Sequence, residues 1–413
     1  MPQAHAAVID PEERGGDVDE LAEDFGAVEE ARGGSRAAFG RLYESFGPMV
    51  HAIVLARAGR RVIVRERRRN VGARFHGDFQ GLENWSAERD VLDEFRDLGV
   101  PVEAPLHPVY RGEAYDFMGR RFPVSDDKPL YYLLRRGPGG GTLDEALLKE
   151  ARAAGAEIRF GDEVKRAPKN AVIATGPRRA DVIASGYTFR TKMDDAQHVC
   201  FDDRLAPWGY AYLLIADGRG TLAVCMFRDF KRHRECLEAA KAFFQQHSGL
   251  VMCDPKPFGG YGMLSRITRV ERKGRRLVGE RAGLQDGLAG FGLRYAITSG
   301  ALAAQSFLGG ASYEKLLRRR LGSIHGAGVV NRLVFQVVGD KGRAWALARL
   351  SERVGRRGLR RLYRGSLVHR ALFPIAAAGF GDRLNHPGCR HVDCDCPWCR
   401  MTEKRDRLPD LQL

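Results

Sequence analysis

Four cysteines and one histidine lie within eleven residues near the C-terminal end of the sequence. Thiolate and imidazole groups are preferred ligands of Zn²⁺, and four of them can surround one ion tetrahedrally. The last two cysteines have the C-x-x-C spacing of a zinc knuckle. An iron–sulfur cluster is an alternative, although the overall spacing is not a common cluster pattern, and free thiols in a disordered tail are another. The candidate ligands are Cys389, Cys394, Cys396 and Cys399.

A second group of residues that could do chemistry lies in the glycine-rich stretch 276–300. Residues 276–279 are typical of a short buried strand, 280–292 of a loop, and 293–307 carries apolar residues at helical spacing. A strand, a glycine loop and a helix N-terminus together present free backbone N–H groups to an anion. Glu280 can accept hydrogen bonds from a sugar-like hydroxyl. The glycines expected to approach a ligand are Gly279, Gly283, Gly290 and Gly292. An ordinary strand-to-helix turn is the alternative.

This stretch resembles the second flavin motif of the FAD-dependent geranylgeranyl reductase family. The resemblance is continuous over residues of about 52–321. In that family an acidic residue after a glycine binds the ribityl chain, so the resemblance implies this role for Glu280, which stands where the family usually has Asp. It also implies that FAD, reduced by NADPH or a ferredoxin-like donor, passes a hydride to a carbon–carbon double bond of an isoprenoid or a similar apolar substrate.

A carboxylate at the end of an earlier strand provides a further candidate. Residues 53–58 end a helix at Gly59, and residues 61–66 are typical of a strand that finishes on Glu66. A helix, a tight turn, a strand and a carboxylate make up the second half of a Rossmann βαβ unit. The resemblance implies that Glu66 holds the adenosine ribose hydroxyls. The alternative is a solvated charge among arginines.

The first half of that unit does not have the expected residues. The three fingerprint glycines should fall at positions that hold Tyr43, Ser45 and Pro48, and no apolar strand precedes them. Side chains there occupy the space in which backbone must approach a pyrophosphate. We therefore expect that the affinity for FAD is weakened or lost.

The segment that replaces the first strand resembles a different family. Residues 28–53, VEEARGGSRAAFGRLYESFGPMVHAI, resemble the opening helices of region 2 in extracytoplasmic-function sigma factors. The promoter-reading helices that should follow are absent from the sequence. The resemblance therefore implies a fragment. It supports an alternative function, in which a degenerate flavoprotein scaffold without FAD acts through its N-terminal helix, with RNA polymerase core as the partner.

Several other residues are candidates through the reductase resemblance. Arg136 precedes a glycine loop and matches an arginine that contacts the cofactor, although it could be an ordinary loop-edge arginine. Residues 170–176 form a strand that ends in Thr175 and Gly176, where small residues let backbone pass close to a dinucleotide. The substrate pocket is expected to include Asn84, Trp85 and Tyr261; for the first two, a buried turn is an equal alternative.

These observations predict an α/β protein with a Rossmann-like FAD-binding fold, an altered first βα unit, an inserted antiparallel β-sheet substrate domain and a helical C-terminal region. The expected divisions are a disordered acidic tail (1–35), the first part of the FAD-binding domain (36–176), the substrate domain (177–267), the second FAD-binding part (268–310), the helical region (311–380) and a cysteine-rich tail (386–400).

The net charge of +15 is compatible with nucleic acid, an anionic membrane surface or an anionic ligand. The basic residues are mostly scattered arginines without interleaved aromatic side chains, so no nucleic-acid partner is expected. The N-terminus has no signal-peptide pattern and no run of 18 apolar residues exists, which predicts a cytoplasmic protein. Basic helices in 311–380 are compatible with peripheral membrane binding; the alternative is a helical cover with an Arg-rich solvated face.

Overall fold

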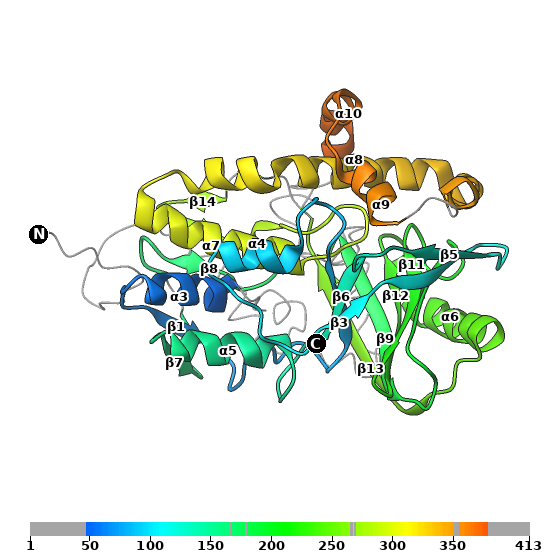
Figure 1. The fold of residues 1–413 in the computed structure, drawn as a ribbon, viewed down its shortest axis with the longest axis horizontal. Coiled ribbons are helices and arrows are strands. Elements are labelled where there is room, and N and C mark those ends of the chain that lie inside the picture. Colours follow the sequence, from blue (N-terminus) through cyan, green and yellow to red (C-terminus); the bar gives the residue numbers. More distant parts are fainter. Residues whose placement is uncertain are drawn as a thin grey trace, which may run out of the picture.

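The computed structural model describes residues 47–164, 167–177, 180–264, 267, 270–350 and 355–378. One half of the molecule is built on helices and small parallel sheets, and the other half on one large sheet (Figure 1). The long helix α8 (Tyr313–Leu350) runs along both halves. This arrangement confirms the predicted α/β class with a helical C-terminal region.

The first parallel pair joins β1 (Ile63–Glu66) to β7 (Glu157–Phe160), with Ile63 opposite Glu157. Helix α3 (Gly47–Arg57) leads into β1, and Gly59 takes a positive φ of 74° in the turn between them. Helix α5 (Leu143–Ala153) precedes β7 and begins after Thr142, whose side chain accepts a hydrogen bond from the Glu145 amide, in the usual manner of a threonine N-cap. The strands and helices share one apolar core.

The second parallel pair joins β8 (Val172–Ile173) to β15 (Arg275–Leu277), and β14 (Glu271–Arg272) adds an antiparallel edge. A short 3-10 helix, η2 (Gly279–Ala282), follows β15, and helix α7 (Leu293–Gly309) begins eleven residues later. Helix α3 packs on α7, on α5 and on both parallel pairs. Among the described strands, none pairs with the second edge of β1 or of β8.

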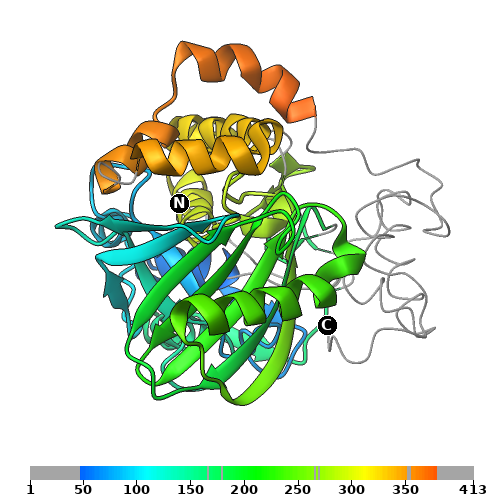
Figure 2. The same ribbon diagram turned by 90° about the vertical axis from the view of Figure 1, so that its right-hand side faces the viewer.

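The large sheet has seven strands in the order β13-β9-β12-β11-β10-β4-β5, antiparallel except for β10 and β4. The bounds are β4 (Arg111–Asp116), β5 (Arg121–Ser125), β9 (Val182–Arg190), β10 (Ala196–Phe201), β11 (Tyr210–Ala216), β12 (Arg219–Met226) and β13 (Cys253–Gly262). Asp217 and Gly218, both at positive φ, close the predicted β11–β12 hairpin. Helix α6 (His233–Ser248) covers one face (Figure 2). The sheet therefore also includes two strands from outside the predicted insert.

A fourth sheet, with three strands, connects the two halves. It consists of β2 (Phe79–Glu83), β6 (Tyr131–Arg135) and β3 (His107–Val109), in the order β2-β6-β3. Helix α4 (Val91–Asp97) follows β2 and starts at Asp90, which caps it through the Leu92 amide. The end of β6 leads directly into the glycine loop before α5. Residues on these strands thus lie between the parallel pairs and the large sheet.

The C-terminal region consists of α8, α9 (Arg356–Tyr363) and α10 (Leu367–Ala378). Helix α8 is broken at Gly339, whose φ of 58° is not helical. Its first half covers the second parallel pair, with Tyr313 and Leu317 fully buried. None of the helices in the described part of the chain has the length and hydrophobicity needed to cross a bilayer.

Two predictions lie outside the described residues. The candidate zinc ligands Cys389, Cys394, Cys396 and Cys399 belong to the segment after residue 378, and most of the sigma-like segment precedes residue 47. Within the described ranges no cluster of histidine, cysteine and carboxylate side chains has the arrangement of a metal site. The zinc site therefore stays a prediction, which metal analysis of the purified protein would check.

Candidate functional site

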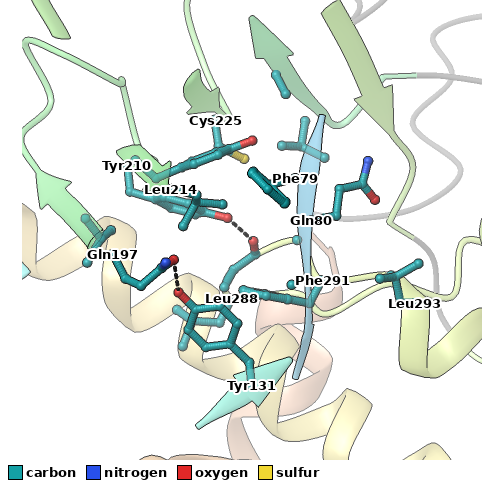
Figure 3. A pocket seen from close by; sticks show the side chains of 18 of the residues that line it. Phe79, Gln80, Tyr131, Gln197, Tyr210, Leu214, Cys225, Leu288, Phe291 and Leu293 are labelled. Atoms are coloured by element: carbon teal, nitrogen blue, oxygen red, sulfur yellow. Dashed lines mark hydrogen bonds between the residues drawn. The ribbon is translucent and has the colours of Figure 1, made fainter. Parts of the chain in front are cut away.

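A cavity of about 570 Å³ lies between the large sheet, the three-stranded sheet and the loop that precedes α7. Its lining is mostly apolar. Figure 3 shows Leu214 and Tyr210 of the large sheet on one side and Leu288 and Phe291 of the loop on the other. Residues of α8 and α9 complete the wall. Large, mostly apolar cavities with a few polar groups are the usual form of a small-molecule site.

Six of the residues singled out from the sequence line this one cavity: Trp85, Arg136, Tyr261, Glu280, Gly290 and Gly292. They come from β2's end, β6's end, β13, η2 and the loop before α7. The structure therefore brings together segments that lie far apart in the sequence. Six others, namely Glu66, Asn84, Thr175, Gly176, Gly279 and Gly283, are not part of its lining.

The placement of Asn84 in a substrate pocket is not supported by the structure. Its side chain is fully buried and donates hydrogen bonds to Asp90 Oδ2 at 2.9 Å and to the Pro129 carbonyl at 3.0 Å. Its Oδ1 accepts a hydrogen bond from the Val91 amide at 2.8 Å. These bonds fix the turn between β2 and α4, so Asn84 is a turn residue, which was the open alternative. Trp85, the next residue, does line the cavity and meets Phe291 edge-on at 5.0 Å between ring centroids.

Glu280 lies at the cavity wall with its carboxylate paired to the guanidinium of Arg74. Arg74 also donates to the Tyr261 carbonyl at 3.2 Å. Burial lowers the pKa of Arg74, but the Glu280 carboxylate outweighs burial and raises it above the usual value. The predicted hydroxyl-binding carboxylate thus has a charged partner that the sequence pattern did not indicate. The contact with Arg74 involves Oε2, and the two oxygens of a carboxylate have further acceptor sites for a hydroxyl.

Arg136 is buried at the end of β6 and is held from several sides. It pairs with Asp144 at 3.0 Å, donates to Gln80 Oε1 at 3.2 Å and stacks on the Phe75 ring at 3.7 Å. Burial lowers its pKa, and Asp144 partly offsets this effect. Arg136 therefore forms a fixed positive wall of the cavity beside Arg74 rather than a mobile loop-edge charge.

The N-terminus of α7 faces the cavity without a side-chain cap. Its N-cap is Gly292, and the first residue, Leu293, also lines the cavity. The first N–H groups of a helix have no partner within the helix, and the helix dipole makes this end favourable for a negative or carbonyl oxygen. Gly290, at a φ of 77°, lets the chain turn into the helix. These features agree with the anion-binding turn predicted for this stretch.

The loop before α7 is held from behind by the C-terminal helices. Arg332 of α8 is fully buried and donates to the Gly287 carbonyl at 3.0 Å. Asp286 accepts hydrogen bonds from the Ala289 amide at 2.7 Å and from the Tyr363 hydroxyl of α9 at 2.9 Å. A Cβ at Gly287 would lie 2.8 Å from the α8 backbone, so only glycine permits this close approach. No local sequence pattern indicates these anchors, because they depend on distant helices.

A buried ion triad fixes the other side of α7. Arg294 pairs with Glu83 of β2 at 3.1 Å and with Glu94 of α4 at 2.6 Å. Burial lowers the pKa of Arg294, but the two carboxylates outweigh burial and raise it. All three side chains are almost fully buried. The triad joins three elements next to the uncapped helix start, and no local sequence signal pointed to it.

Neutral hydrogen-bonding groups also lie inside the cavity. The Tyr131 hydroxyl donates to Gln197 at 3.0 Å, and the Tyr210 hydroxyl donates to the Ala289 carbonyl (Figure 3). Burial raises the pKa of the Cys225 thiol to about 11, which keeps it protonated at neutral pH. The cavity therefore has a mostly apolar lining with neutral hydrogen-bonding groups and a charged end at Arg74, Arg136 and Glu280. Further charged residues of the lining are Asp78, Arg111, Glu113 and Arg343.

The candidate dinucleotide residues outside the cavity lie at strand ends. Glu66 ends β1, is mostly buried, and accepts a hydrogen bond from the Arg68 amide at 2.6 Å, so it is not a freely solvated charge. Thr175 is exposed and Gly176 has a φ of 81° just beyond β8. Gly279 is the first residue of η2 and Gly283 follows its last, both at positive φ. Their roles in binding a dinucleotide remain proposals.

Proteins similar to this chain are found among solved structures. No family model matches the sequence, and no curated protein matches it significantly. A geranylgeranyl bacteriochlorophyll reductase-like protein from Thermoplasma acidophilum has a similar structure, with a TM-score of 0.61 and 19% identity; the match covers 81% of this chain and 94% of that one. The flavin-dependent brominase Bmp2 has a TM-score of 0.54 and 14% identity, covering 82% and 97%.

A third structure, the p-nitrophenol 4-monooxygenase PnpA from Pseudomonas putida DLL-E4, has a TM-score of 0.51 and 15% identity, covering 76% of this chain and 93% of its own. The chain therefore has the mixed α/β fold of FAD-binding oxidoreductases. These relatives give no support to the sigma-factor resemblance of residues 28–53. Because a fold hosts many functions, substrate and activity have to be argued from the site.

Proposed function

We propose that this protein is an FAD-dependent oxidoreductase of the geranylgeranyl reductase type, acting on a carbon–carbon double bond of an isoprenoid-like apolar substrate. One observation carries the proposal. The predicted cofactor residues Glu280, Arg136 and Gly292 border the same cavity as the apolar face of the large sheet. A redox cofactor and an apolar substrate need such a shared, largely water-free space.

The residues at the charged end fit the ring system of a flavin. The uncapped start of α7 offers N–H groups and a favourable dipole to the carbonyl edge of the ring. Gly290 and Gly292 leave room there, since neither carries a side chain. Glu280, at the end of the strand–η2 segment, would accept a hydrogen bond from a ribityl hydroxyl while it keeps Arg74 as its partner. FAD would supply the hydride, and NADPH or a ferredoxin-like donor would supply the electrons.

The apolar part of the cavity would bind and orient the substrate. Leu214, Phe79 and Phe291 present hydrocarbon surface from three different elements. Their burial of an apolar chain would contribute about 25 cal/mol per Å² removed from water. Exclusion of water around the reacting carbon would also limit side reactions of a reduced cofactor.

A second candidate, a scaffold that does not bind FAD, is favoured by one observation. Among the described strands, β1 pairs only with β7, and β8 pairs only with β15. Each parallel pair thus has an edge without a described partner, next to α3. In the sequence, the positions expected for the fingerprint glycines hold Tyr43, Ser45 and Pro48. An interrupted dinucleotide-binding unit weakens binding of the adenosine half of FAD.

Flavin titration of the purified full-length protein separates the two candidates. We expect FAD uptake, seen as protein-bound flavin absorbance, and weaker binding in Gly292→Asp by about tenfold or more, because the carboxylate caps α7 and repels the ring carbonyl edge. Gly292→Ala adds the Cβ without the charge, so the difference between the two variants isolates the carboxylate. A Cβ at Gly292 meets Gln285 only at ordinary contact distance, so both variants should fold.

A colourless protein that takes up no FAD would reject the enzyme proposal and favour the scaffold. In that case, a variant with a strand and a Gly-x-Gly-x-x-Gly loop inserted ahead of Ile53 should recover flavin binding. A lack of recovery would show that the missing loop is not the reason. For a flavin-loaded protein, anaerobic reduction with NADPH or with reduced ferredoxin would then identify the electron donor.

A further inference from the structure

Exposed apolar side chains are concentrated on the C-terminal helices. Of the thirteen large apolar side chains exposed in the described chain, eight lie between residues 334 and 375. They are Val334, Val337, Val338, Trp345, Leu362, Leu367, Val368 and Ile375. Single exposed apolar residues are normal, but a concentration on one part of the surface indicates an interaction site.

Helix α10 is apolar on two sides. Its inner side, with Phe373, Ala376 and Ala377, packs on Val329 and Val330 of α8. Its outer side carries Leu367, Val368 and Ile375, which are 79%, 64% and 64% exposed. The helix stands clear of the body of the molecule at the outer side of α8 (Figures 1 and 2). A helix of this kind leaves apolar surface for a partner other than the described part of the chain.

The charged side chains of α9 and α10 all have one sign. Residues 355–378 contain six arginines and no Asp or Glu. Arg356 is buried and donates to the Asn84 carbonyl, so it is a structural residue. Arg357, Arg361, Arg364 and Arg370 are exposed. Two carboxylates adjoin these arginines: Glu88 lies 3.5 Å from Arg360, and Asp340 pairs with Arg343 on α8. Apolar side chains within such a mostly basic surface are complementary to an anionic lipid bilayer, which offers negative headgroups above hydrocarbon.

The same surface is continuous with the cavity. Leu359 and Leu362 of α9 line the cavity, and Leu362 is also exposed. On α8, Ala346 and Leu347 line the cavity next to the exposed Trp345, whose ring lies 5.2 Å from the Arg349 guanidinium. Tryptophan and arginine side chains are typical anchors at the membrane–water boundary. The wall between α8 and α9 therefore connects the exposed apolar surface to the cavity interior.

We infer that the outer side of α10, with α9 and the adjoining part of α8, docks on an anionic lipid bilayer and admits an apolar lipid chain to the cavity between α8 and α9. The docking follows from the exposed side chains and the charge of these helices. The delivery of substrate rests on the proposed function. The first half of α8 covers the parallel sheets. In residues 311–380, the helical cover therefore applies to the first half of α8, and membrane binding applies to the helices that follow it.

The test is sedimentation of the full-length protein with vesicles of phosphatidylcholine alone or mixed with phosphatidylglycerol. We expect binding to the mixed vesicles, little binding to phosphatidylcholine alone, and weaker binding at high salt. Combined Leu367→Ser, Val368→Ser and Ile375→Ser changes should reduce binding by about tenfold or more, and Arg361→Gln with Arg364→Gln by a similar factor. The matched control is Met118→Ser with Val251→Ser, two apolar side chains exposed elsewhere, which should bind like the wild type.

Each other outcome overturns the docking inference. Equal binding to both vesicle types would exclude the role of charge. Absence of binding combined with a dimer that the serine variant dissociates, seen by size-exclusion chromatography, would identify a second copy as the partner. Absence of binding combined with a lower melting temperature of the serine variant would show that another segment of the chain covers α10. Flavin titration is independent of all these results, so a failure of the proposed function is recognised separately.

Discussion

The guanidinium of Arg74 and the carboxylate of Glu280 form an ion pair at the wall of the cavity, although 206 residues separate them in the sequence. Arg74 lies in the segment that follows β1, and Glu280 lies in η2. Both side chains are largely buried. The pair therefore connects the segment after the first parallel pair to the segment after the second, at the place where a cofactor would cross between them.

Removing one member of this pair should destabilise the protein more than removing both. Glu280→Ala leaves the Arg74 guanidinium without its carboxylate in a largely buried site, and we expect the free energy of unfolding to fall by about 3 kcal/mol. Adding Arg74→Met to that variant should recover more than half of the loss. Urea denaturation of the two single variants and the double variant measures the coupling.

Glu280 also allows a separate test of its proposed role in binding FAD. Glu280→Gln keeps the shape of the side chain and removes its charge, so the fold should be less affected than by alanine. If Glu280 binds a ribityl hydroxyl, the Kd for FAD should rise by about tenfold, as expected for one lost charge-assisted hydrogen bond. An unchanged Kd would mean that Glu280 serves only as the partner of Arg74.

The buried triad next to α7 leads to a stability prediction. Arg294→Met removes the cation that Glu83 and Glu94 share. Glu94 keeps its pair with the partly exposed Arg320 at 3.1 Å, but Glu83 loses its ion pair in a buried site, and we expect a loss of about 3–5 kcal/mol. Arg318→Met is the control, because Arg318 forms an exposed pair with Glu314 on α8 and should contribute less than about 1 kcal/mol. Thermal and urea unfolding of both variants give the comparison. Similar losses in the two variants would contradict a special role for the triad.

Local patterns predicted the local structure well. Gly59 ends the turn after α3, Thr142 caps α5, and Asp217 with Gly218 closes the β11–β12 hairpin, as their residue types indicated. In each case the determining contacts lie within a few residues in the sequence. The strand–loop–helix order at 275–309 was also predictable, because its glycines and its apolar spacing are both local signals.

Contacts between distant segments were not predictable from these patterns. The parallel pairing of β4 with β10 brings two strands from outside the expected insert into the large sheet, and no turn signal specifies such a pairing. Asn84 was a pocket candidate through the reductase resemblance, with a buried turn as the equal alternative, and its amide fixes a local turn. Arg332 gave no signal because its acceptor, the Gly287 carbonyl, belongs to another element.

Two glycines in the cavity wall provide a matched pair of variants. A Cβ at Gly81 would collide with the Phe291 ring, whereas a Cβ at Gly260 would meet no atom within 4 Å. Gly81→Ala should therefore displace Phe291, lower the stability by about 1–3 kcal/mol as in other overpacked sites, and change ligand affinity. Gly260→Ala should leave stability within about 0.5 kcal/mol of the wild type. Urea unfolding and flavin titration of both variants test whether Phe291 shapes the cavity.

The carboxyl group of Asp286 should make the stability depend on pH. Burial raises its pKa to about 6, while hydrogen bonds from the Ala289 amide and the Tyr363 hydroxyl favour the charged form and limit the rise. Since the unfolded value is about 3.9, the folded state holds the proton more tightly, and the stabilisation present below pH 4 is lost as the pH rises through 6. A shift of about two units corresponds to about 3 kcal/mol.

The comparison of wild type with Asp286→Asn isolates this group. His51 changes the free energy of unfolding with pH in the opposite direction. Burial lowers its pKa to about 3, so below pH 6.5 the unfolded state binds a proton that the folded state does not, and the stability falls as the pH falls. His51 is present in both proteins, so its contribution cancels in the difference. We expect the free energy of unfolding of the wild type, relative to the variant, to fall by up to about 3 kcal/mol between pH 4 and pH 7. If the difference in free energy of unfolding between the two proteins does not change with pH, Asp286 is already ionised in the folded protein throughout this range. The loop before α7 would then be held by a charged and not by a protonated carboxyl group.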